Sequence, residues 1–360
     1  MLKDKVLRAL AWQSGAKIVT QLFSFLVTII LARNLLPEDY GVVGMALVFT
    51  GLISLINELG IGSSIIRDQN TTEEQLSSVF WFALCVSIVL FCATFFLAPL
   101  IGQIYRNEQV VMVVRVLAIN LIIGAFRTVP FSLLTRELKF DKRSKAEVLS
   151  AFAGGTTALV MAFSGFGVWS LVFNAIANSI GLVVLSFYFS QWRPMASFRF
   201  SQAKDMVNFG AKIMGSRIQW YAYSNADFFI IGRLLGKEML GYYTMAFTLA
   251  SFVTEKITAV VNQVTFPTFS KLQNDVERLQ EAFLKATKYV SMLTFPAITI
   301  IAILAEEIVI TLLTQKWLPI VFPLRILCLV GFIRSVDVIL PQALVAKGKA
   351  GLVLKYTSLL

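Results

Sequence analysis

The segment "SGAKIVTQLFSFLVTIILARNLLPEDYG" (residues 14–41) holds the two features that decide the fold. Its apolar part runs for about 20 residues, the length that an α-helix needs to cross the hydrocarbon core of a bilayer. It also carries a cation, Lys17, inside that apolar part, and it ends in a polar motif. Both features recur further along the chain.

The composition extends the membrane interpretation to the whole chain. Of 360 residues, 57% are hydrophobic and 15% are charged, whereas a soluble domain has about 25% charged residues. The apolar runs are continuous rather than alternating, which favours helices over a transmembrane β-barrel. We therefore predict an all-α polytopic membrane protein and exclude a single soluble core.

Ten complete transmembrane helices and part of an eleventh are expected. The basic segment "MLKDKVLR" (1–8) is followed by no small-residue cleavage site, so the first apolar run is interpreted as an uncleaved span. The eleventh helix begins near Gly351 and stops at Leu360. The ten expected spans are residues 9–32, 41–66, 77–104, 110–134, 146–164, 167–189, 208–232, 240–266, 289–313 and 320–344. Between the second and third spans, Thr71 and Glu74 are expected to form a capping box.

Positive charge is concentrated in alternate loops. The loops after the fourth, sixth and eighth spans (135–145, 190–207 and 267–288) hold most of the loop lysines and arginines. The positive-inside rule then places the N-terminus and these loops in the cytoplasm. The net charge of +11 belongs to that face, where it also attracts anionic lipid, and nothing in the pattern supports nucleic-acid binding.

Two segments match at a spacing of 200 residues. "ARNLLPEDYG" (32–41) ends the first span and "GRLLGKEMLGYY" (232–243) ends the seventh. Further back, "GAKI" (15–18) matches "GSRI" (215–218), so Lys17 has Arg217 as its counterpart. The identical pairs in the longer match are Arg33 and Arg233, Leu35 and Leu235, Glu38 and Glu238, and Gly41 and Gly241.

Six spans separate the two copies, so both halves have the same orientation in the membrane. That arrangement predicts two pseudo-symmetric six-helix bundles, residues 1–200 and 201–360, related by an axis along the membrane normal with a cavity between them. The second bundle is incomplete, because most of its last two helices are missing. We expect the chain to be a fragment, or a variant that lacks those helices.

Charged residues at membrane depth are the candidate functional groups. Lys17 and Glu58 each lie eight residues, or about 12 Å, from a cytoplasmic helix end and are predicted to pair. Arg217 is predicted to pair with Glu255 in the same way, and Arg334 with Asp337 three residues on along one helix face. The candidate substrate-binding residues are Lys17, Arg217, Lys256, Arg334, Trp220 and Tyr221, and the candidate coupling or counter-ion carboxylates are Glu58, Glu255, Asp227 and Asp337.

Structural explanations stand beside these functional ones. Lysine and arginine near an interface extend their heads to water, and a Lys17–Glu58 bridge could be purely structural. Asp227 could cap a helix or pair with Arg233. The aromatic and amide residues of "RIQWYAYSNADFF" (217–229) suit sugar faces, but an interfacial belt of aromatic residues has the same composition.

Several classes of chemistry find no support in the sequence. The chain has no histidine, and its three cysteines show no CxxC spacing, so no metal site is expected. It has no phosphate-binding glycine loop, so no nucleotide cofactor is expected and ATP-driven transport by this chain alone is unsupported. Catalytic residues are expected to be absent.

The sequence resembles the polysaccharide transporter family, the Wzx-type lipid-linked oligosaccharide flippases of the multidrug/oligosaccharidyl-lipid/polysaccharide superfamily. Within it, "LTRELKF" (134–140) and residues 232–243 look most like the branch of colanic-acid and teichuronic-type exporters. The segments that carry the resemblance are "LARNLLPEDYGVVGMALVF" (31–49), "ELGIGSSIIR" (58–67), "LLTRELKF" (133–140), "GFGVWSLV" (165–172), "ADFFIIGRLLGKEMLGYYTMAF" (226–247) and "FPTFSKLQND" (266–275).

The resemblance implies a flippase rather than an enzyme. It implies twelve or more helices in two lobes that move undecaprenyl-pyrophosphate-linked repeat units from the cytoplasmic to the periplasmic leaflet of the bacterial inner membrane. The units would serve exopolysaccharide, capsule or O-antigen export. It further implies alternating access through a cationic central cavity, coupling to an ion gradient, and work beside polysaccharide polymerase and export proteins.

Three alternatives are weighed against this function. An ion-coupled multidrug or metabolite antiporter of the same superfamily would favour clustered intramembrane carboxylates, whereas here bases outnumber acids at depth. A major-facilitator carrier would have a G-x-x-x-D-[RK]-x-G-R loop, which "SSIIRDQNTTEEQL" (63–76) lacks. A membrane polymerase or ligase would need a large periplasmic loop, and the corresponding loops here are short.

Overall fold

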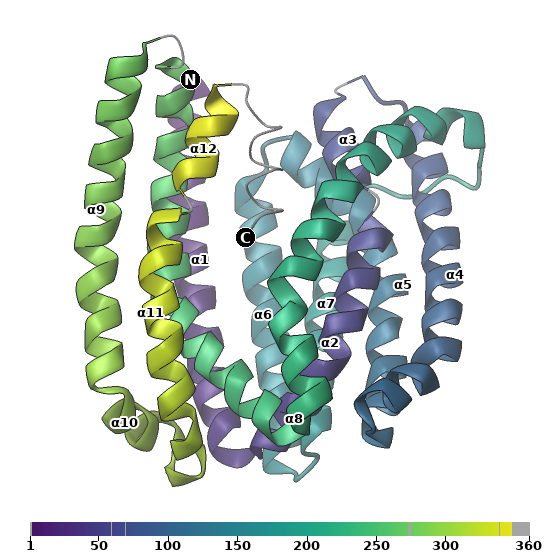
Figure 1. The fold of residues 1–360 in the computed structure, drawn as a ribbon. Coiled ribbons are helices and arrows are strands. Elements are labelled where there is room, and N and C mark those ends of the chain that lie inside the picture. The colour runs from purple at the N-terminus through teal and green to yellow at the C-terminus, as the bar shows by residue number, and fades with distance from the viewer. Residues whose placement is uncertain (1, 59, 69, 273–274, 338, 348–360) are drawn as a thin grey trace. The chain divides into compact units, whose positions relative to one another are not determined.

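The computed structural model describes the backbone of residues 2–58, 60–68, 70–272, 275–337 and 339–347. The side chains of residues 2–14 and 200–216, most of 253–271, and 345–346 are outside the description. Throughout the described residues the secondary structure is helical (Figure 1). The elements are α1 (Leu2–Asn34), α2 (Pro37–Glu58), α3 (Ile61–Arg67), α4 (Glu73–Tyr105), α5 (Glu108–Arg136), α6 (Phe140–Phe163), α7 (Val168–Ser190), α8 (Phe200–Lys271), α9 (Val276–Ile303), α10 (Ala305–Ile308), the π-helical turn η1 (Val309–Leu313), the 3-10 helix η2 (Gln315–Ile320), α11 (Val321–Asp337) and α12 (Ile339–Ala346).

Eight segments within the described residues are long and apolar enough to cross a bilayer. They correspond to the first six expected spans and to the ninth and tenth, and the protein is an all-helical polytopic membrane protein. The seventh and eighth expected spans lie on α8, and the expected eleventh helix lies outside the described residues. The matching segments are residues 15–34, 37–67, 73–105, 108–136, 140–163, 168–190, 276–303 and 315–344.

The ninth span is shifted from its expected position. We expected residues 289–313, but the helix begins at Val276 and ends at Ile303. The apolar run on which the expectation rested starts after the first turns of α9, where Asp275 caps the helix by accepting a hydrogen bond from the Arg278 backbone N–H. Residues 305–313 form α10 and the π-helical turn instead.

The capping box is one residue later than expected. The Thr72 hydroxyl accepts from the Gln75 backbone N–H at 3.2 Å, and the Gln75 side chain accepts from the Thr72 N–H at 3.0 Å. The prediction of Thr71 and Glu74 was therefore wrong. Glutamine satisfies the motif as well as glutamate does, and the position of the first helical turn, at Glu73, decides between the two.

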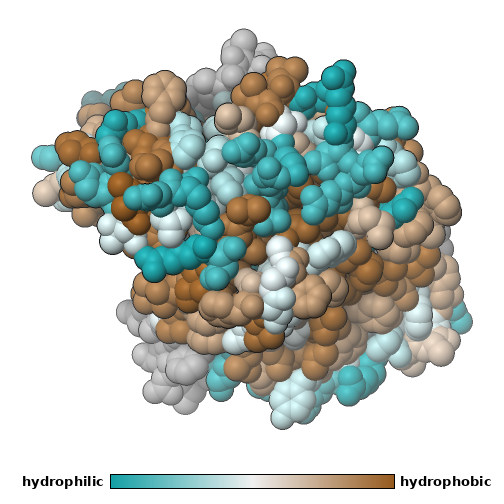
Figure 2. Space-filling view, turned by 90° about the horizontal axis from the view of Figure 1, so that it is seen from below, coloured by the Kyte–Doolittle hydropathy of each residue, from teal (hydrophilic) through white to brown (hydrophobic). Residues whose placement is uncertain are grey.

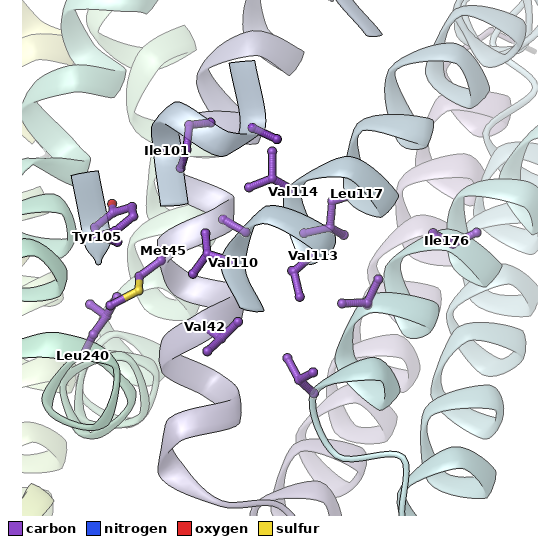
Figure 3. Packing of buried hydrophobic residues seen from close by; sticks show 14 residues of the cluster. Val42, Met45, Ile101, Tyr105, Val110, Val113, Val114, Leu117, Ile176 and Leu240 are labelled. Atoms are coloured by element: carbon purple, nitrogen blue, oxygen red, sulfur yellow. The ribbon is translucent and has the colours of Figure 1, made fainter. Parts of the chain in front are cut away.

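The chain forms two compact units, residues 1–241 and 242–360, which are described separately. In the first unit α4 packs on α5, α6 on α7, and α1 on α6, while α5 also contacts α2 and α7. Figure 3 shows its core, a cluster that includes Val42 of α2 with Val110 and Val113 of α5, and in which Met45 lies beside Leu240. In the second unit α9 packs on α11 and α12.

Helix α8 contains a break at Gly236. Its φ of 84° and ψ of −176° are not helical, so two helices meet at this residue. A Cβ at this position would meet nothing within 4 Å, so the glycine is required by its backbone conformation and not by lack of space. The break lies within the second copy of the repeat motif, between its Arg233 and its Glu238.

The segment 191–199, which joins α7 to α8, is tied to the first turns of α4. Trp192 Nε1 donates to Glu73 Oε2 at 2.8 Å, and the Met195 N–H donates to Ser77 Oγ at 2.9 Å. Trp81 Nε1 donates back to the Met195 carbonyl at 2.8 Å. The ring of Trp192 is buried in the small core that Phe80 and Ile65 help to form. The connection is therefore fixed to the first unit along its length.

Large apolar side chains are exposed along the helices. Examples are Phe96 on α4 at 77%, Leu234 on α8 at 73% and Phe322 on α11 at 73%. Hydrophobic residues cover much of the face drawn in Figure 2, with hydrophilic residues between them. Such a surface would be a liability in water, but the hydrocarbon of a bilayer covers it.

Candidate functional site

A polar cavity of about 170 Å³ lies among α2, α5 and α7 in the first unit. Polar side chains form most of its wall, although the three helices are otherwise apolar. Since an unsatisfied polar group in a membrane protein is costly, a polar cavity among membrane-spanning helices is a candidate for function. The lining residues are Ser54, Asn57, Glu58, Asn120, Ile123, Gly124, Arg127, Thr128 and Ser179.

Asn57 and Asn120 have different roles in the wall. Asn57 Nδ2 donates to the Leu121 carbonyl at 2.9 Å, and the Ser87 hydroxyl lies 2.6 Å from Asn57 Oδ1, so Asn57 joins α2 to α5 and α4. Asn120 Oδ1 is buried and accepts no hydrogen bond from any residue that the structure describes. Asn57 thus links the helices that form the wall, whereas the carbonyl oxygen of the Asn120 side chain can accept a hydrogen bond from a ligand.

Glu58 forms an ion pair with Arg217. Arg217 Nη1 lies 3.6 Å from Glu58 Oε2, with the two side chains 43% and 60% exposed. The predicted Lys17–Glu58 pair is therefore wrong, and Lys17 is exposed and forms no ion pair within the described part of the chain. The prediction used depth alone, whereas the packing of α1 on α6 determines where Lys17 lies around the bundle.

Arg127 is a cation on the cavity wall that forms no ion pair with a described carboxylate. Its guanidinium lies over the Phe131 ring, 5.5 Å from the centroid, and it forms no ion pair among the described residues. Arg143 lies over the same ring at 4.7 Å, but it is neutralised by Glu147, whose Oε1 accepts from Arg143 Nε at 3.0 Å.

The aromatic candidates differ in exposure and contacts. Trp220 is 55% exposed. The Tyr221 hydroxyl donates to the carbonyls of α2, at 2.9 Å from Leu47 O and 3.2 Å from Val48 O. It lies so close to Gly51 that a Cβ there would collide with the hydroxyl. Tyr221 therefore fastens α8 to α2.

Three further candidates, Asp227, Arg334 and Asp337, are not among the residues that line the cavity. Asp227 Oδ1 accepts from the Phe228 N–H at 2.9 Å. In the second unit, the Arg334 guanidinium lies 5.7 Å from the centre of the Phe247 ring. Asp337 lines an apolar groove with Phe295, Phe332, Ile333 and Val336. The pairing of Arg334 with Asp337 stays a prediction.

Two candidates, Glu255 and Lys256, have side chains outside the described residues. The predicted contact between Arg217 and Glu255 accordingly stays a prediction.

The sequence analysis did not predict the uncharged residues that line the cavity. Asn120, Gly124 and Thr128 recur every fourth residue along α5, and Ser54 precedes Glu58 by one turn on α2. Residues four apart share a helix face, so a polar stripe at that spacing is the signal that could have indicated the wall. Ser179 of α7 gives no such signal, because nothing in sequence shows that α7 faces this stripe.

The comparisons with known proteins identify the family. A profile described as "Polysaccharide biosynthesis protein" matches residues 30–322. The chain belongs to this family. The resemblance in the sequence is confirmed, and the family is one of transporters.

Two relatives in the family show how much of a whole protein the chain represents. It is 27% identical to the lipopolysaccharide biosynthesis protein WzxC of Escherichia coli, over 99% of this chain and 73% of that protein. It is 28% identical to the teichuronic acid biosynthesis protein TuaB of Bacillus subtilis, over 86% of this chain and 64% of that protein. The chain thus spans roughly two thirds to three quarters of these relatives.

Solved structures show the fold. The lipid II flippase MurJ in an inward closed conformation aligns with a TM-score of 0.75 at 13% identity, over 96% of this chain and 78% of that one. An inward-facing multidrug resistance transporter of the MATE family aligns with a TM-score of 0.70 at 19% identity, over 94% and 83%. The fold therefore belongs to flippases and to drug transporters alike.

Proposed function

We propose that this protein moves lipid-linked oligosaccharide repeat units from the cytoplasmic to the periplasmic leaflet of the bacterial inner membrane. The observation that carries the proposal is the match to the polysaccharide biosynthesis family over residues 30–322. Two family relatives named for surface polysaccharides, a lipopolysaccharide and a teichuronic acid, support it. The substrate would be an undecaprenyl-pyrophosphate-linked oligosaccharide destined for exopolysaccharide, capsule or O-antigen.

The chemistry of the substrate asks for a polar, cationic path. A pyrophosphate must cross about 30 Å of hydrocarbon while its lipid tail stays in the membrane. Lys17 and Arg217, one from each proposed lobe (1–200 and 201–360), would engage the anionic head by alternating access. The 3.6 Å pair between Arg217 and Glu58 supports a resting state in which a carboxylate holds the cation until substrate displaces it.

Further residues complete the proposed cycle. Lys256, Arg334, Trp220 and Tyr221 would contact the substrate, and Glu58, Glu255, Asp227 and Asp337 would serve as counter-ions or couple transport to an ion gradient. The N-terminus would lie in the cytoplasm, as the positive loops indicate. Polysaccharide polymerase and export proteins would act on the product.

The second candidate function is an ion-coupled multidrug or metabolite antiporter, which the MATE-like fold favours. A cationic drug calls for unpaired carboxylates in its site. In the described cavity the one carboxylate, Glu58, has Arg217 beside it, and Arg127 is a second cation on the wall. The cavity thus suits an anion better than a cation.

The deciding experiment uses a strain in which the full-length gene is deleted. Lipid-linked oligosaccharides are extracted from inner-membrane vesicles, and the fraction on the cytoplasmic leaflet is measured. Accumulation there with loss of surface polysaccharide, restored by the gene, is the expected result. No accumulation, with increased sensitivity to small cationic compounds, would favour the antiporter.

The role of the two cations is tested in the same strain. Export should fail with Lys17→Ala and with Arg217→Ala at normal protein levels. Normal export by both variants would show that these cations do not carry the substrate.

A further inference from the structure

One face of α5 carries a continuous row of functional groups. Asn120, Gly124 and Thr128 follow at intervals of four residues and line the cavity, and Arg127 lies beside Thr128. Continuing along the helix from Arg127, Phe131 and Thr135 follow at intervals of four residues. Both contact Arg143 of α6, since Thr135 Oγ1 accepts from Arg143 Nη1 at 3.1 Å and Phe131 lies under its guanidinium.

Two guanidinium groups share the Phe131 ring but differ in their charge balance. Arg143 has Glu147 and Thr135 as hydrogen-bond partners, so its charge is compensated within the fold. Arg127 has the ring contact at 5.5 Å and no ion pair among the described residues. A guanidinium in a membrane protein is costly without an anion, and a ring face compensates only part of that cost.

The carboxylate that could neutralise Arg127 is engaged elsewhere. Glu58 lines the same cavity, but its Oε2 lies beside Arg217 Nη1. The wall around Arg127 otherwise offers hydroxyl groups, from Ser54, Thr128 and Ser179. The cavity therefore has an uncompensated positive charge and room next to it.

A second observation indicates what kind of ligand fits. Asn120 Oδ1, on the same wall, is a buried acceptor that receives no hydrogen bond from the described residues. A buried acceptor that receives no hydrogen bond is unfavourable, so a ligand that brings a donor is favoured. An oxyanion for Arg127 and a neighbouring hydroxyl for Asn120 would satisfy both groups at once.

We propose that this cavity binds an oxyanion of the transported glycan through Arg127, with an adjacent hydroxyl of the same ligand donating to Asn120. The inference rests on the proposed function. Two parts of a lipid-linked glycan carry an oxyanion: an acidic sugar, whose carboxylate has ring hydroxyls beside it, and the pyrophosphate of the carrier. Arg143 and Phe131 position Arg127 and do not contact the ligand.

The first test measures anion binding directly. The whole chain is purified in a non-ionic polyoxyethylene detergent, which contains neither phosphate nor sugar. Its unfolding temperature is measured at increasing concentrations of sodium glucuronate or sodium pyrophosphate, with sodium chloride as the reference salt. A ligand that binds the folded state raises the unfolding temperature with concentration. Stabilisation by glucuronate identifies the acidic sugar as the source, and stabilisation by pyrophosphate identifies the carrier.

Arg127→Gln should weaken this binding at least tenfold, and Arg127→Lys should retain part of it. Arg115→Gln is the matched control, because Arg115 is on the same helix and lies over Phe95 at 4.6 Å, outside the cavity. Asn120→Leu should weaken binding of glucuronate. If neither anion stabilises the wild type, or if Arg127→Gln binds as well as Arg115→Gln, the proposal is overturned.

The outcome is separable from that of the proposed function. If anion binding by the purified protein depends on Arg127 but deletion of the gene causes no accumulation of lipid-linked glycan, the anion site is supported and the flippase function is refuted. If lipid-linked glycan accumulates in the deletion strain but Arg127→Gln leaves anion binding unchanged, the flippase function is supported and the anion site is refuted.

Discussion

Gly41 and Gly241 make reciprocal contacts in the first unit. A Cβ on Gly41 would collide with the carbonyl oxygen of Lys237, and a Cβ on Gly241 would collide with the carbonyl oxygen of Pro37. Each glycine thus packs on the residue four positions before its counterpart, and Gly241 would also bring its Cβ to 3.2 Å from the Gly41 nitrogen. A reciprocal pattern of this kind is what a two-fold relation between two copies produces.

Alanine at either glycine should destabilise the protein. The neighbours are backbone atoms, which cannot rotate away, so Gly41→Ala and Gly241→Ala should each cost about 1–3 kcal/mol of folding free energy. The readout is thermal unfolding in detergent. Gly15→Ala is the control, because a Cβ at Gly15 meets nothing within 4 Å. Equal stability of all three variants would refute the close backbone contact.

Gly236 should be sensitive for a different reason. Its φ of 84° with an extended ψ is a conformation that side chains disfavour, although space for a Cβ is available. Gly236→Ala should therefore cost about 1–3 kcal/mol through backbone strain. Gly124→Ala, in a regular helix with equal space, should be neutral or stabilising. If both substitutions have the same effect on thermal unfolding, α8 is not broken at Gly236.

The ion pair of Glu58 with Arg217 can be tested by exchanging charges. Both side chains are about half exposed, so either single reversal should change stability by less than about 1 kcal/mol. Each reversal, Glu58→Arg or Arg217→Glu, should lower the unfolding temperature slightly, because it brings two like charges together, and the double variant should regain the wild-type value. The comparison is the double variant Glu58→Lys with Lys17→Glu, which should not recover. Recovery in that second pair would mean that Lys17 is the partner.

The link from Glu73 to Trp192 should hold the segment 191–199 in place. Glu73→Ala removes the acceptor of the Trp192 indole N–H. Cleavage by trypsin after the exposed Arg193 should therefore become several-fold faster. The rate is measured in inside-out inner-membrane vesicles, which expose the cytoplasmic face to the protease. Glu108→Ala is the control, since Glu108 is likewise an acid in the first turn of its helix. Unchanged cleavage would show that the other hydrogen bonds suffice.

Helix positions were largely predictable, and the errors have local causes. The length of the apolar runs predicted the ends of α4, α5 and α7 to within four residues and the start of α6 to within six, because crossing a bilayer requires an unbroken apolar helix. The ninth span was misplaced because α9 begins with charged turns that hydropathy does not count. The cap at Thr72 was missed by one residue, since Thr71 and Thr72 both fit the capping pattern.

The functional cavity was predictable only in part. Glu58 was found because a charge in an apolar run is visible in the sequence. Asn120 and Ser179 were not, because a neutral polar residue on a membrane helix has many harmless explanations until its neighbours are known.

By itself the sequence determined the membrane class, most of the helices and the 200-residue repeat, all of which follow from hydrophobic length and local similarity. Only the tertiary structure decided that Glu58 pairs with Arg217, that Gly41 and Gly241 make matching contacts, and that one face of α5 lines a polar cavity. The physical reason is geometric. The rise per residue fixes the height of a side chain along its helix, but its direction around the bundle depends on which helices pack together.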